Sequence, residues 1–284
     1  MSDGFTIVTG AYGFIGSKLV KYLNSKGIND KLIVVDYISN GRSFRSLDGA
    51  KFGLYMPPEE LLAHIEGMHK SGIKIDRIYH LGAISDTDFW DGELIMRRNY
   101  QYSVNLIAQA AVCNIPITYA SSASVYGNDK GPLNLYAYSK WLVDQYVSRY
   151  CESANVQGFR FFNVYSDDDA EKYKRQPSPH YKFKQQALET GRIEVFEGSE
   201  HFFRDFVHVD RVCQVMYDMA QSNIGGIFDL GSGVKTSFLD VAQQIANQYE
   251  ADIIEIPFPE HLQGCYQLNT LANMEYLETV YDQH

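Results

Sequence analysis

The sequence has few cysteines, no long apolar run and no early targeting segment. Its four cysteines, Cys113, Cys151, Cys213 and Cys265, are scattered and form no CxxC pair, which argues against a disulfide framework or a thiolate metal site. A strand pattern begins within the first residues, so we expect no signal peptide. No apolar run reaches the length of a membrane span. We therefore expect no metal, no membrane association and a cytoplasmic location.

The chain also lacks a block of basic residues. Its 284 residues carry a formal net charge of -10, so we expect no nucleic acid as a partner. Hydrophobic residues make up 45% of the chain and charged residues 21%, which is typical of a folded protein with a substantial core. An acidic protein can still bind a phosphorylated ligand through backbone N–H groups and a few Arg or Lys side chains.

Short β-branched runs alternate with amphipathic helical patterns in the first half. We predict strands at 5–9, 31–36, 77–80 and 115–121, and helices at 16–26, 99–113 and 136–150. This alternation predicts an α/β fold, with a Rossmann-type doubly wound parallel sheet. From residue 164 the pattern loosens into a polar stretch with Pro177 and Pro179, which favours a smaller substrate-binding lobe.

We expect two domains in the chain. The dinucleotide-binding domain would comprise residues 1–163 and about 204–234, and the substrate-binding lobe about 164–203 and 235–284.

A glycine-rich turn follows the first predicted strand. Gly10 permits the tight turn, Gly13 lets the backbone approach a phosphate, and Gly16 lets the helix pack on the strand. Asp36 ends the next strand, where a ribose-binding carboxylate is expected. Its charge favours NAD, whereas Arg42 could pair with the 2′-phosphate of NADP or be a solvated loop cation. The sequence predicts one bound nicotinamide dinucleotide and leaves NAD or NADP open.

A Tyr-x-x-x-Lys pair, Tyr136 and Lys140, lies on a predicted helix. Side chains four residues apart share a helix face, so the Lys140 ammonium could lower the tyrosine pKa. Tyr136 could then accept a proton from a substrate hydroxyl. Ser122 lies at the end of a predicted strand, where open α/β sheets bind ligands. These three side chains, downstream of a glycine turn, predict a dehydrogenase-type active site.

Segments over most of the chain resemble the extended short-chain dehydrogenase/reductase family of NAD-dependent epimerases and dehydratases. They include TGAYGFIGS (9–17), NYQYS (99–103), YASSASVYG (119–127), LNLYAYSK (133–140), GFRFFNVYS (158–166), FEGSEHFFRDFVHV (196–209), IFDLGSG (227–233) and IPFPEHLQGCYQ (256–267). Within the family, 196–209 and 256–267 are most similar to the branch that inverts C6 of ADP-linked heptoses.

The resemblance implies transient oxidation of a nucleotide-linked sugar with a tightly bound cofactor that is not consumed. Inversion needs acid-base groups on both faces of the carbon. Tyr136 would be one, and Lys172 or Lys174 falls where the family has the other. Alternatively, both lysines are solvated loop residues with no role in catalysis.

The resemblance also assigns cofactor- and substrate-binding positions. For the cofactor these are Gly10, Tyr12, Gly13, Phe14, Ile15, Gly16, Asp36, Arg42, Leu81, Gly82, Ala83, Asn99, Tyr136, Lys140 and Phe162. For the substrate they are Asp86, Thr87, Ser122, Asn163, Phe196, Glu197, Arg204 and Tyr266. Arg204 suits a diphosphate, or alternatively an interdomain salt bridge. Trp90 could approach the sugar, but core packing is favoured.

Three functions stay open. The resemblance favours an epimerase acting on the two ADP-glycero-D-manno-heptoses, and it implies a homo-oligomer. The alternatives are a UDP-hexose 4-epimerase or another epimerase or dehydratase of the family, and a non-catalytic dinucleotide-binding regulator. Dehydratases of the family usually carry an acidic pair after the catalytic hydroxyl, where Ala123 and Ser124 stand.

Overall fold

A computed structural model describes residues 4–38, 43–127, 131–151, 155–167, 177–222, 224–260, 267 and 269–281. Four of the predicted site residues, Arg42, Lys172, Lys174 and Tyr266, lie outside the described residues.

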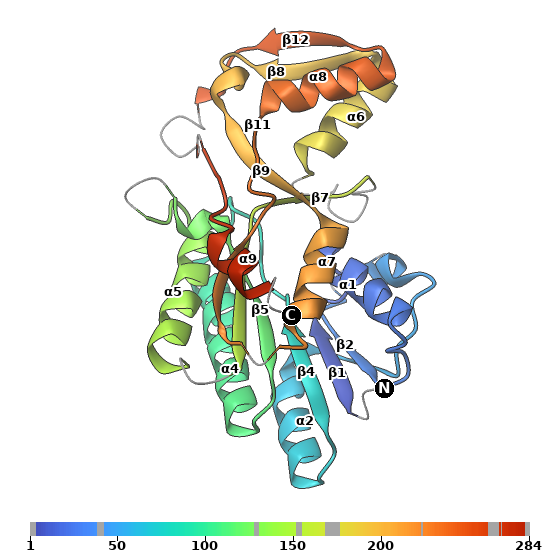
Figure 1. Cartoon of the computed structure of the whole chain (residues 1–284), viewed down its shortest axis with the longest axis vertical. Helices are drawn as coiled ribbons and strands as arrows, with labels where there is room; N and C mark the ends of the chain where they lie inside the picture. Colours follow the sequence, from blue (N-terminus) through green and yellow to red (C-terminus); the bar gives the residue numbers. More distant parts are fainter. Residues whose placement is uncertain are drawn as a thin grey trace.

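A parallel sheet of seven strands forms the lower body of the molecule (Figure 1). Its order is β10-β6-β5-β4-β1-β2-β3. The strands are β1 (Phe5–Thr9), β2 (Leu32–Val35), β3 (Leu54–Met56), β4 (Ile75–His80), β5 (Ile117–Ser122), β6 (Val156–Phe161) and β10 (Gly226–Leu230). Both faces are buried, so the strands are rich in Val and Ile rather than alternating with polar residues.

Helices cover both faces of this sheet, which confirms the Rossmann-type prediction. The helices α1 (Phe14–Ser25), α7 (Val209–Met219) and α9 (Glu275–Tyr281) pack in one hydrophobic core. On the opposite face, α2 (Pro58–Lys70), α4 (Tyr102–Val112) and α5 (Leu135–Tyr150) pack in a second core. Because all seven strands are parallel, their carboxyl ends meet at one edge, where ligands bind in such folds.

A smaller lobe lies above that edge (Figure 1). The helices α6 (Pro179–Thr190) and α8 (Phe238–Tyr249) pack with the strand pair β8 (Arg192–Phe196) and β12 (Asp252–Ile256) around a third core. A three-stranded sheet of β7 (Asn163–Tyr165), β9 (Phe203–His208) and β11 (Lys235–Ser237) connects the lobe to the large sheet.

The division into two domains remains a proposal, and two segments bear on its boundaries. Strand β9 belongs to the connecting sheet, although α7 and β10 after it return to the large sheet. Helix α9 packs on the large sheet through Leu277 and Val280, and the Tyr276 ring stacks on Phe228 at 4.9 Å.

Short helical segments complete the description: η1 (Ser43–Leu47), α3 (Gly92–Ile95), η2 (Met96–Gln101), η3 (Ala123–Val125) and η4 (Ser199–His201). The segment η2 is a π-helical turn before α4, so the predicted helix at 99–113 is irregular at its start. Among the described residues, no helix is both long and apolar enough to span a membrane.

Candidate active site

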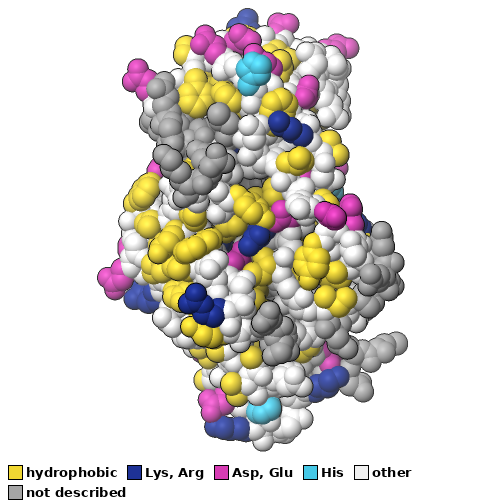
Figure 2. All heavy atoms as spheres, turned by 60° about the vertical axis from the view of Figure 1, so that its left-hand side comes forward, with side chains coloured by type: hydrophobic (Ala, Val, Ile, Leu, Met, Phe, Trp, Pro, Cys, Tyr) yellow, Lys and Arg dark blue, Asp and Glu magenta, His cyan; other side chains and the backbone are white. Residues whose placement is uncertain are grey.

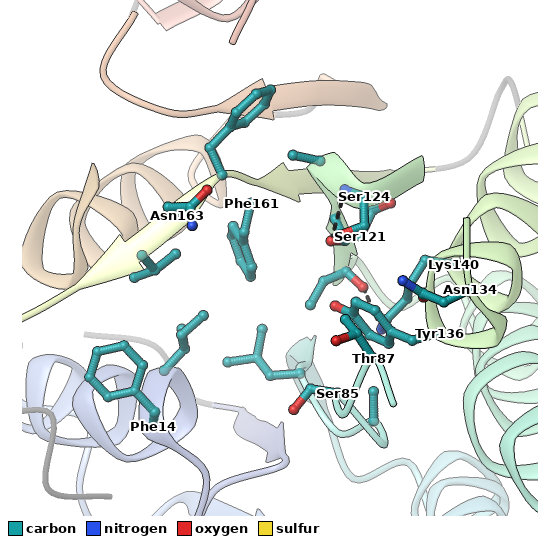
Figure 3. A pocket seen from close by; sticks show the side chains of 18 of the residues that line it. Phe14, Ser85, Thr87, Ser121, Ser124, Asn134, Tyr136, Lys140, Phe161 and Asn163 are labelled. Carbon is teal, nitrogen blue, oxygen red and sulfur yellow. Dashed lines mark hydrogen bonds between the residues drawn. The ribbon is translucent and has the colours of Figure 1, made fainter. Parts of the chain in front are cut away.

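A cavity of about 850 Å³ opens at the carboxyl edge of the large sheet (Figure 3). The ends of β1, β4, β5 and β6 and the first turns of α1 and α5 form its walls, and Arg204 and Phe238 reach it from the smaller lobe. It brings together most of the predicted site residues: Gly10, Gly13, Phe14, Ile15, Gly16, Asp36, Leu81, Gly82, Ala83, Thr87, Ser122, Tyr136, Lys140, Phe162, Asn163 and Arg204.

The glycine turn has the close backbone contacts that a dinucleotide site requires. Gly10 has a φ of 68°, and a Cβ there would lie 2.6 Å from the backbone nitrogen of Gly82. A Cβ on Gly16 would collide with the Gly10 carbonyl oxygen. Gly13 is the N-cap of α1 and supplies no side-chain cap, so the first N–H groups of α1 are available to a phosphate. These residues fit the pyrophosphate of a dinucleotide.

Asp36 lies at the end of β2 and faces both this cavity and a smaller adjoining pocket of about 270 Å³. Its carboxylate accepts the backbone N–H of Tyr12 at 2.8 Å and of Tyr37 at 2.7 Å. Burial raises the pKa of Asp36, while these two hydrogen bonds lower it. In the smaller pocket Arg98 lies over the Tyr37 ring at 4.3 Å, which gives an adenosine group a flat wall beside a ribose-binding carboxylate.

Tyr136 and Lys140 lie close together on one wall of the cavity (Figure 3). Ser122 lines the same cavity and forms a hydrogen bond with Tyr136. Asn134 caps α5 by accepting the N–H of Ala137 at 2.8 Å, so Tyr136 and Lys140 occupy the first two turns on one face. Lys140 is buried, and its Nζ donates to the Ala120 carbonyl oxygen of β5 at 2.7 Å. This bond fixes the helix against the strand that carries Ser122.

Burial opposes the charged forms of both Tyr136 and Lys140. It raises the pKa of Tyr136, whereas the hydrogen bond with Ser122 lowers it. Burial lowers the pKa of Lys140 to about 8, partly opposed by Asp144. An ammonium beside a phenol in a buried site favours the phenolate, which allows a tyrosine to accept a proton.

Arg204 lies at the far end of the cavity, on β9. It is buried, donates to the Phe203 carbonyl oxygen at 2.9 Å, and its guanidinium lies 5.3 Å from the centre of the Phe238 ring. A guanidinium held between a backbone carbonyl and an aromatic ring is preorganised for an anionic group.

Five predicted residues do not line this cavity. The side chain of Tyr12 packs near Tyr55, with ring centres 6.0 Å apart. Asn99 is fully buried, and Asp86 caps a turn by accepting the N–H of Asp88. Phe196 and Glu197 lie at the end of β8 in the smaller lobe, where Phe196 packs on Phe258 at 5.5 Å.

The expectation that Trp90 packs in the core is wrong. Trp90 is 65% exposed and lines the cavity mouth, because its indole N–H bonds to Asp88 at the surface at 3.1 Å. The sequence reasoning also missed several lining residues: Ser85, Asn134, Phe238, Gln267 and Thr270. The helix-cap position of Asn134 could have indicated it. Ser85 lies between the predicted residues Ala83 and Asp86, whereas Phe238, Gln267 and Thr270 come from distant segments with no local pattern.

Three solved structures are similar to the whole chain. The Helicobacter pylori ADP-L-glycero-D-manno-heptose-6-epimerase has a TM-score of 0.84 and 27% identity, covering 99% of this chain and 91% of that one. A Methanobrevibacter ruminantium UDP-N-acetylglucosamine 4-epimerase has a TM-score of 0.79 and 22% identity, covering 99% and 92%. The Thermus thermophilus UDP-glucose 4-epimerase, in complex with NAD, has a TM-score of 0.73 and 21% identity, covering 97% and 92%. The last two show the fold.

A family model matches residues 6–231, which include the glycine turn, Asp36 and the Ser122–Tyr136–Lys140 set. The chain therefore belongs to the NAD dependent epimerase/dehydratase family and is an enzyme that uses a nicotinamide dinucleotide.

Proposed function

We propose that the protein is a nucleotide-sugar epimerase that interconverts ADP-D-glycero- and ADP-L-glycero-D-manno-heptose at C6 through transient oxidation. The observation that carries the epimerase proposal is the convergence of Ser122, Tyr136 and Lys140 in the cavity that also holds the glycine turn. The choice of heptose rests on 27% identity to the Helicobacter pylori enzyme over 99% of the chain.

The cofactor would lie along the wall that begins at the glycine turn. The N–H groups at the start of α1 would face its pyrophosphate, and Asp36 its adenosine ribose. Because the Asp36 carboxylate would repel a 2′-phosphate, we propose NAD rather than NADP. Gly82, Ala83 and Phe162 would flank the nicotinamide end. When bound there, the cofactor would supply reversible hydride transfer at the sugar carbon and would be regenerated in every turnover.

The proton chemistry falls to the chain's own residues. Tyr136 would accept the proton of the reacting hydroxyl when the sugar carbon is oxidised. Ser122 would donate a hydrogen bond to the same oxygen, and the Lys140 ammonium would stabilise the phenolate. On the other face of the carbon, Lys172 or Lys174 would be the second acid-base group.

The substrate would extend from Tyr136 towards the smaller lobe. Asn163 and Thr87 would contact the sugar, and Arg204 would bind the diphosphate. Tyr266, Phe196 and Glu197 would lie towards the nucleotide base. The exposed Trp90 ring at the cavity mouth would cover an apolar sugar face.

We also propose a homo-oligomer and a cytoplasmic location. Hydrophobic side chains gather on one face of the molecule (Figure 2). Helices α4 and α5 leave large apolar residues exposed, including Val112 at 79% and Tyr150 at 67%. Cys113, Cys151 and Cys213 are free and buried, which suits a reducing compartment.

Incubation with ADP-D-glycero-D-manno-heptose, followed by NMR for the C6 epimer, tests the proposal. UDP-, GDP- and dTDP-hexoses should run beside it, because a UDP-hexose 4-epimerase would invert C4 instead. We expect inversion of the heptose alone. Inversion of a hexose without inversion of the heptose would overturn the substrate assignment. If no sugar were inverted, the proposal that the protein is an epimerase would be overturned.

A further inference from the structure

A buried histidine behind the active site bridges two strand ends and a helix. His80 is the last residue of β4, and only 2% of it is exposed. Its Nδ1 lies 2.7 Å from the Thr9 hydroxyl, and its Nε2 lies 2.8 Å from the Ser103 hydroxyl. His80 is not among the described residues that line the active-site cavity or its adjoining pocket.

The hydrogen bonds around His80 determine which group is the donor in each of them. Ser103 donates its proton to the Asn99 carbonyl oxygen at 2.5 Å, so its oxygen accepts from His80 Nε2–H. His80 Nδ1 is then an acceptor in the neutral ring, and the Thr9 hydroxyl donates to it. The Thr9 oxygen in turn accepts the backbone N–H of Gly82 at 3.1 Å. Burial, and then the nearby Lys140, lower the pKa of His80 to about 3, so the ring is neutral.

One end of this chain of bonds holds the cofactor turns together. Thr9 precedes Gly10, and Gly82 follows β4 by two residues. The two turns touch backbone to backbone, since a Cβ on Gly10 would lie 2.6 Å from the Gly82 nitrogen. Gly10 and Gly82 both line the cavity, so a shift of either turn moves the cofactor-binding wall.

The other end reaches the catalytic helix. Asn99 lies in the π-helical turn η2, a feature that recurs at functional sites. Its carboxamide accepts from the N–H of Ile84 at 2.8 Å and donates to the Ile84 carbonyl at 2.9 Å and to Ser139 Oγ at 3.1 Å. Ser139 precedes Lys140 and donates to the Tyr136 carbonyl oxygen at 2.7 Å.

We propose that His80 is a positioning residue that, through Thr9 and Ser103, holds the glycine turn and the Tyr136–Lys140 helix at a fixed separation across the active site. The ring suits this task because it bonds in two opposite directions from one rigid plane. A flexible side chain would hold neither end as firmly. The inference rests on the family's cofactor and active site, and it does not depend on which sugar is the substrate.

The test uses enzyme loaded with NAD and compares His80→Leu, His80→Gln and Ser103→Ala with the wild type. We expect His80→Leu and Ser103→Ala to release NAD about tenfold faster and to lower kcat about tenfold, with KM for the sugar changed less than about twofold. His80→Gln, whose amide can donate towards Ser103, should recover part of both losses. The double variant His80→Leu/Ser103→Ala should change the NAD release rate and kcat little more than the worse single variant does, because both substitutions interrupt the same chain of hydrogen bonds.

Tyr79→Phe is the matched control. Tyr79 is buried in the same strand as His80, but it packs in the hydrophobic core that contains α1 and α7. It should leave NAD release and kcat unchanged. If the His80 and Ser103 variants lower only the melting temperature, and keep NAD release and kcat per folded chain, the positioning role is overturned. If the wild type inverts no sugar tested, the proposed function fails, but the NAD release rates still decide the role of His80.

Discussion

Tyr136 is the residue whose surroundings most constrain the chemistry. Burial keeps its phenol neutral, so it needs a hydrogen bond and a nearby cation before it can accept a proton. Ser122 supplies the hydrogen bond from the end of β5. Lys140, one helical turn from Tyr136 and lining the same cavity, would supply the cation. The arrangement can move a proton only while all three side chains stay together.

We expect Tyr136→Phe to lower kcat by about 10²- to 10⁴-fold, because the proton acceptor is lost. The change removes one oxygen from a site that faces a cavity, so the melting temperature and bound NAD should stay near wild-type values. Tyr138→Phe on the same helix is the control, since Tyr138 is 44% exposed and does not line the cavity. Full activity in Tyr136→Phe would refute the proton-transfer role.

Lys140 sets the expected pH dependence. Because its pKa in the free enzyme is about 8, the ammonium is lost as pH rises through that value, and the phenolate loses its stabilising charge. We therefore expect kcat/KM to fall above pH 8, about tenfold per pH unit. In Lys140→Arg, whose guanidinium stays charged, this alkaline limb should move to higher pH even if the rate is lower. An unchanged limb in Lys140→Arg would assign it to another group.

At the scale of elements, the glycine turn between β1 and α1 decides whether a dinucleotide can bind. A methyl group on Gly16 would collide with the Gly10 carbonyl, so the helix must move away from the strand. We expect Gly16→Ala to destabilise the fold by about 3 kcal/mol and to lose bound NAD, as measured by denaturant unfolding and by nucleotide content.

Gly67→Ala is the matched control for that change. Gly67 lies in α2, and nothing stands within 4 Å of an added Cβ. Alanine should therefore raise the free energy of unfolding by about 0.5–1 kcal/mol through helix propensity. Equal effects of the two substitutions would contradict the close helix–strand contact at Gly16.

Local patterns predicted β1, β2, β4 and β5 of the large sheet, but not β3, β6 or helix α2. The strands predicted at 5–9 and 31–36 match β1 and β2 within a residue, and the helix at 136–150 matches α5. The smaller lobe could not be predicted in this way. Strand β9 pairs with β7, some forty residues earlier, and with β11, thirty residues later, and such pairing leaves no local signal.

The candidate site, like the fold, could be predicted from the sequence only in part. The glycine turn, Ser122, Tyr136 and Lys140 stand in compact motifs, so their convergence could be predicted. His80 could not be singled out, because its partners Thr9 and Ser103 lie 71 and 23 residues away. Trp90 was misplaced because hydrophobic character alone favours burial, whereas a local bond to Asp88 holds it at the surface.

At the scale of the whole molecule, Asp205 ties the parts around the cleft together. It is fully buried on β9, and its carboxylate accepts four hydrogen bonds, from Ser232 N and Oγ, Gly233 N and Ala272 N. These donors come from the turn after β10 and from the segment before α9. The carboxylate therefore links the connecting sheet to the turn after β10 and to the segment before α9.

We expect Asp205→Asn to lower the free energy of unfolding by about 3 kcal/mol, because the new amide group would face backbone N–H donors and the remaining bonds lose their charge. Denaturant unfolding measures this change. Asp210→Asn is the control, since the Asp210 side chain is 80% exposed, and it should stay within about 0.5 kcal/mol of the wild type. A neutral effect of Asp205→Asn would mean that the lobes are held together elsewhere.

We propose that the sugar carbon is inverted by removing its hydrogen as a hydride and returning it within the active site, with Tyr136 moving only the hydroxyl proton. The most direct measurement is epimerisation of ADP-D-glycero-D-manno-heptose in D₂O, with the inverted carbon followed by NMR. We expect a C6 epimer that carries no solvent deuterium on that carbon. Incorporation of deuterium at C6 would show that the C–H proton exchanges with water, and would contradict inversion by transient oxidation.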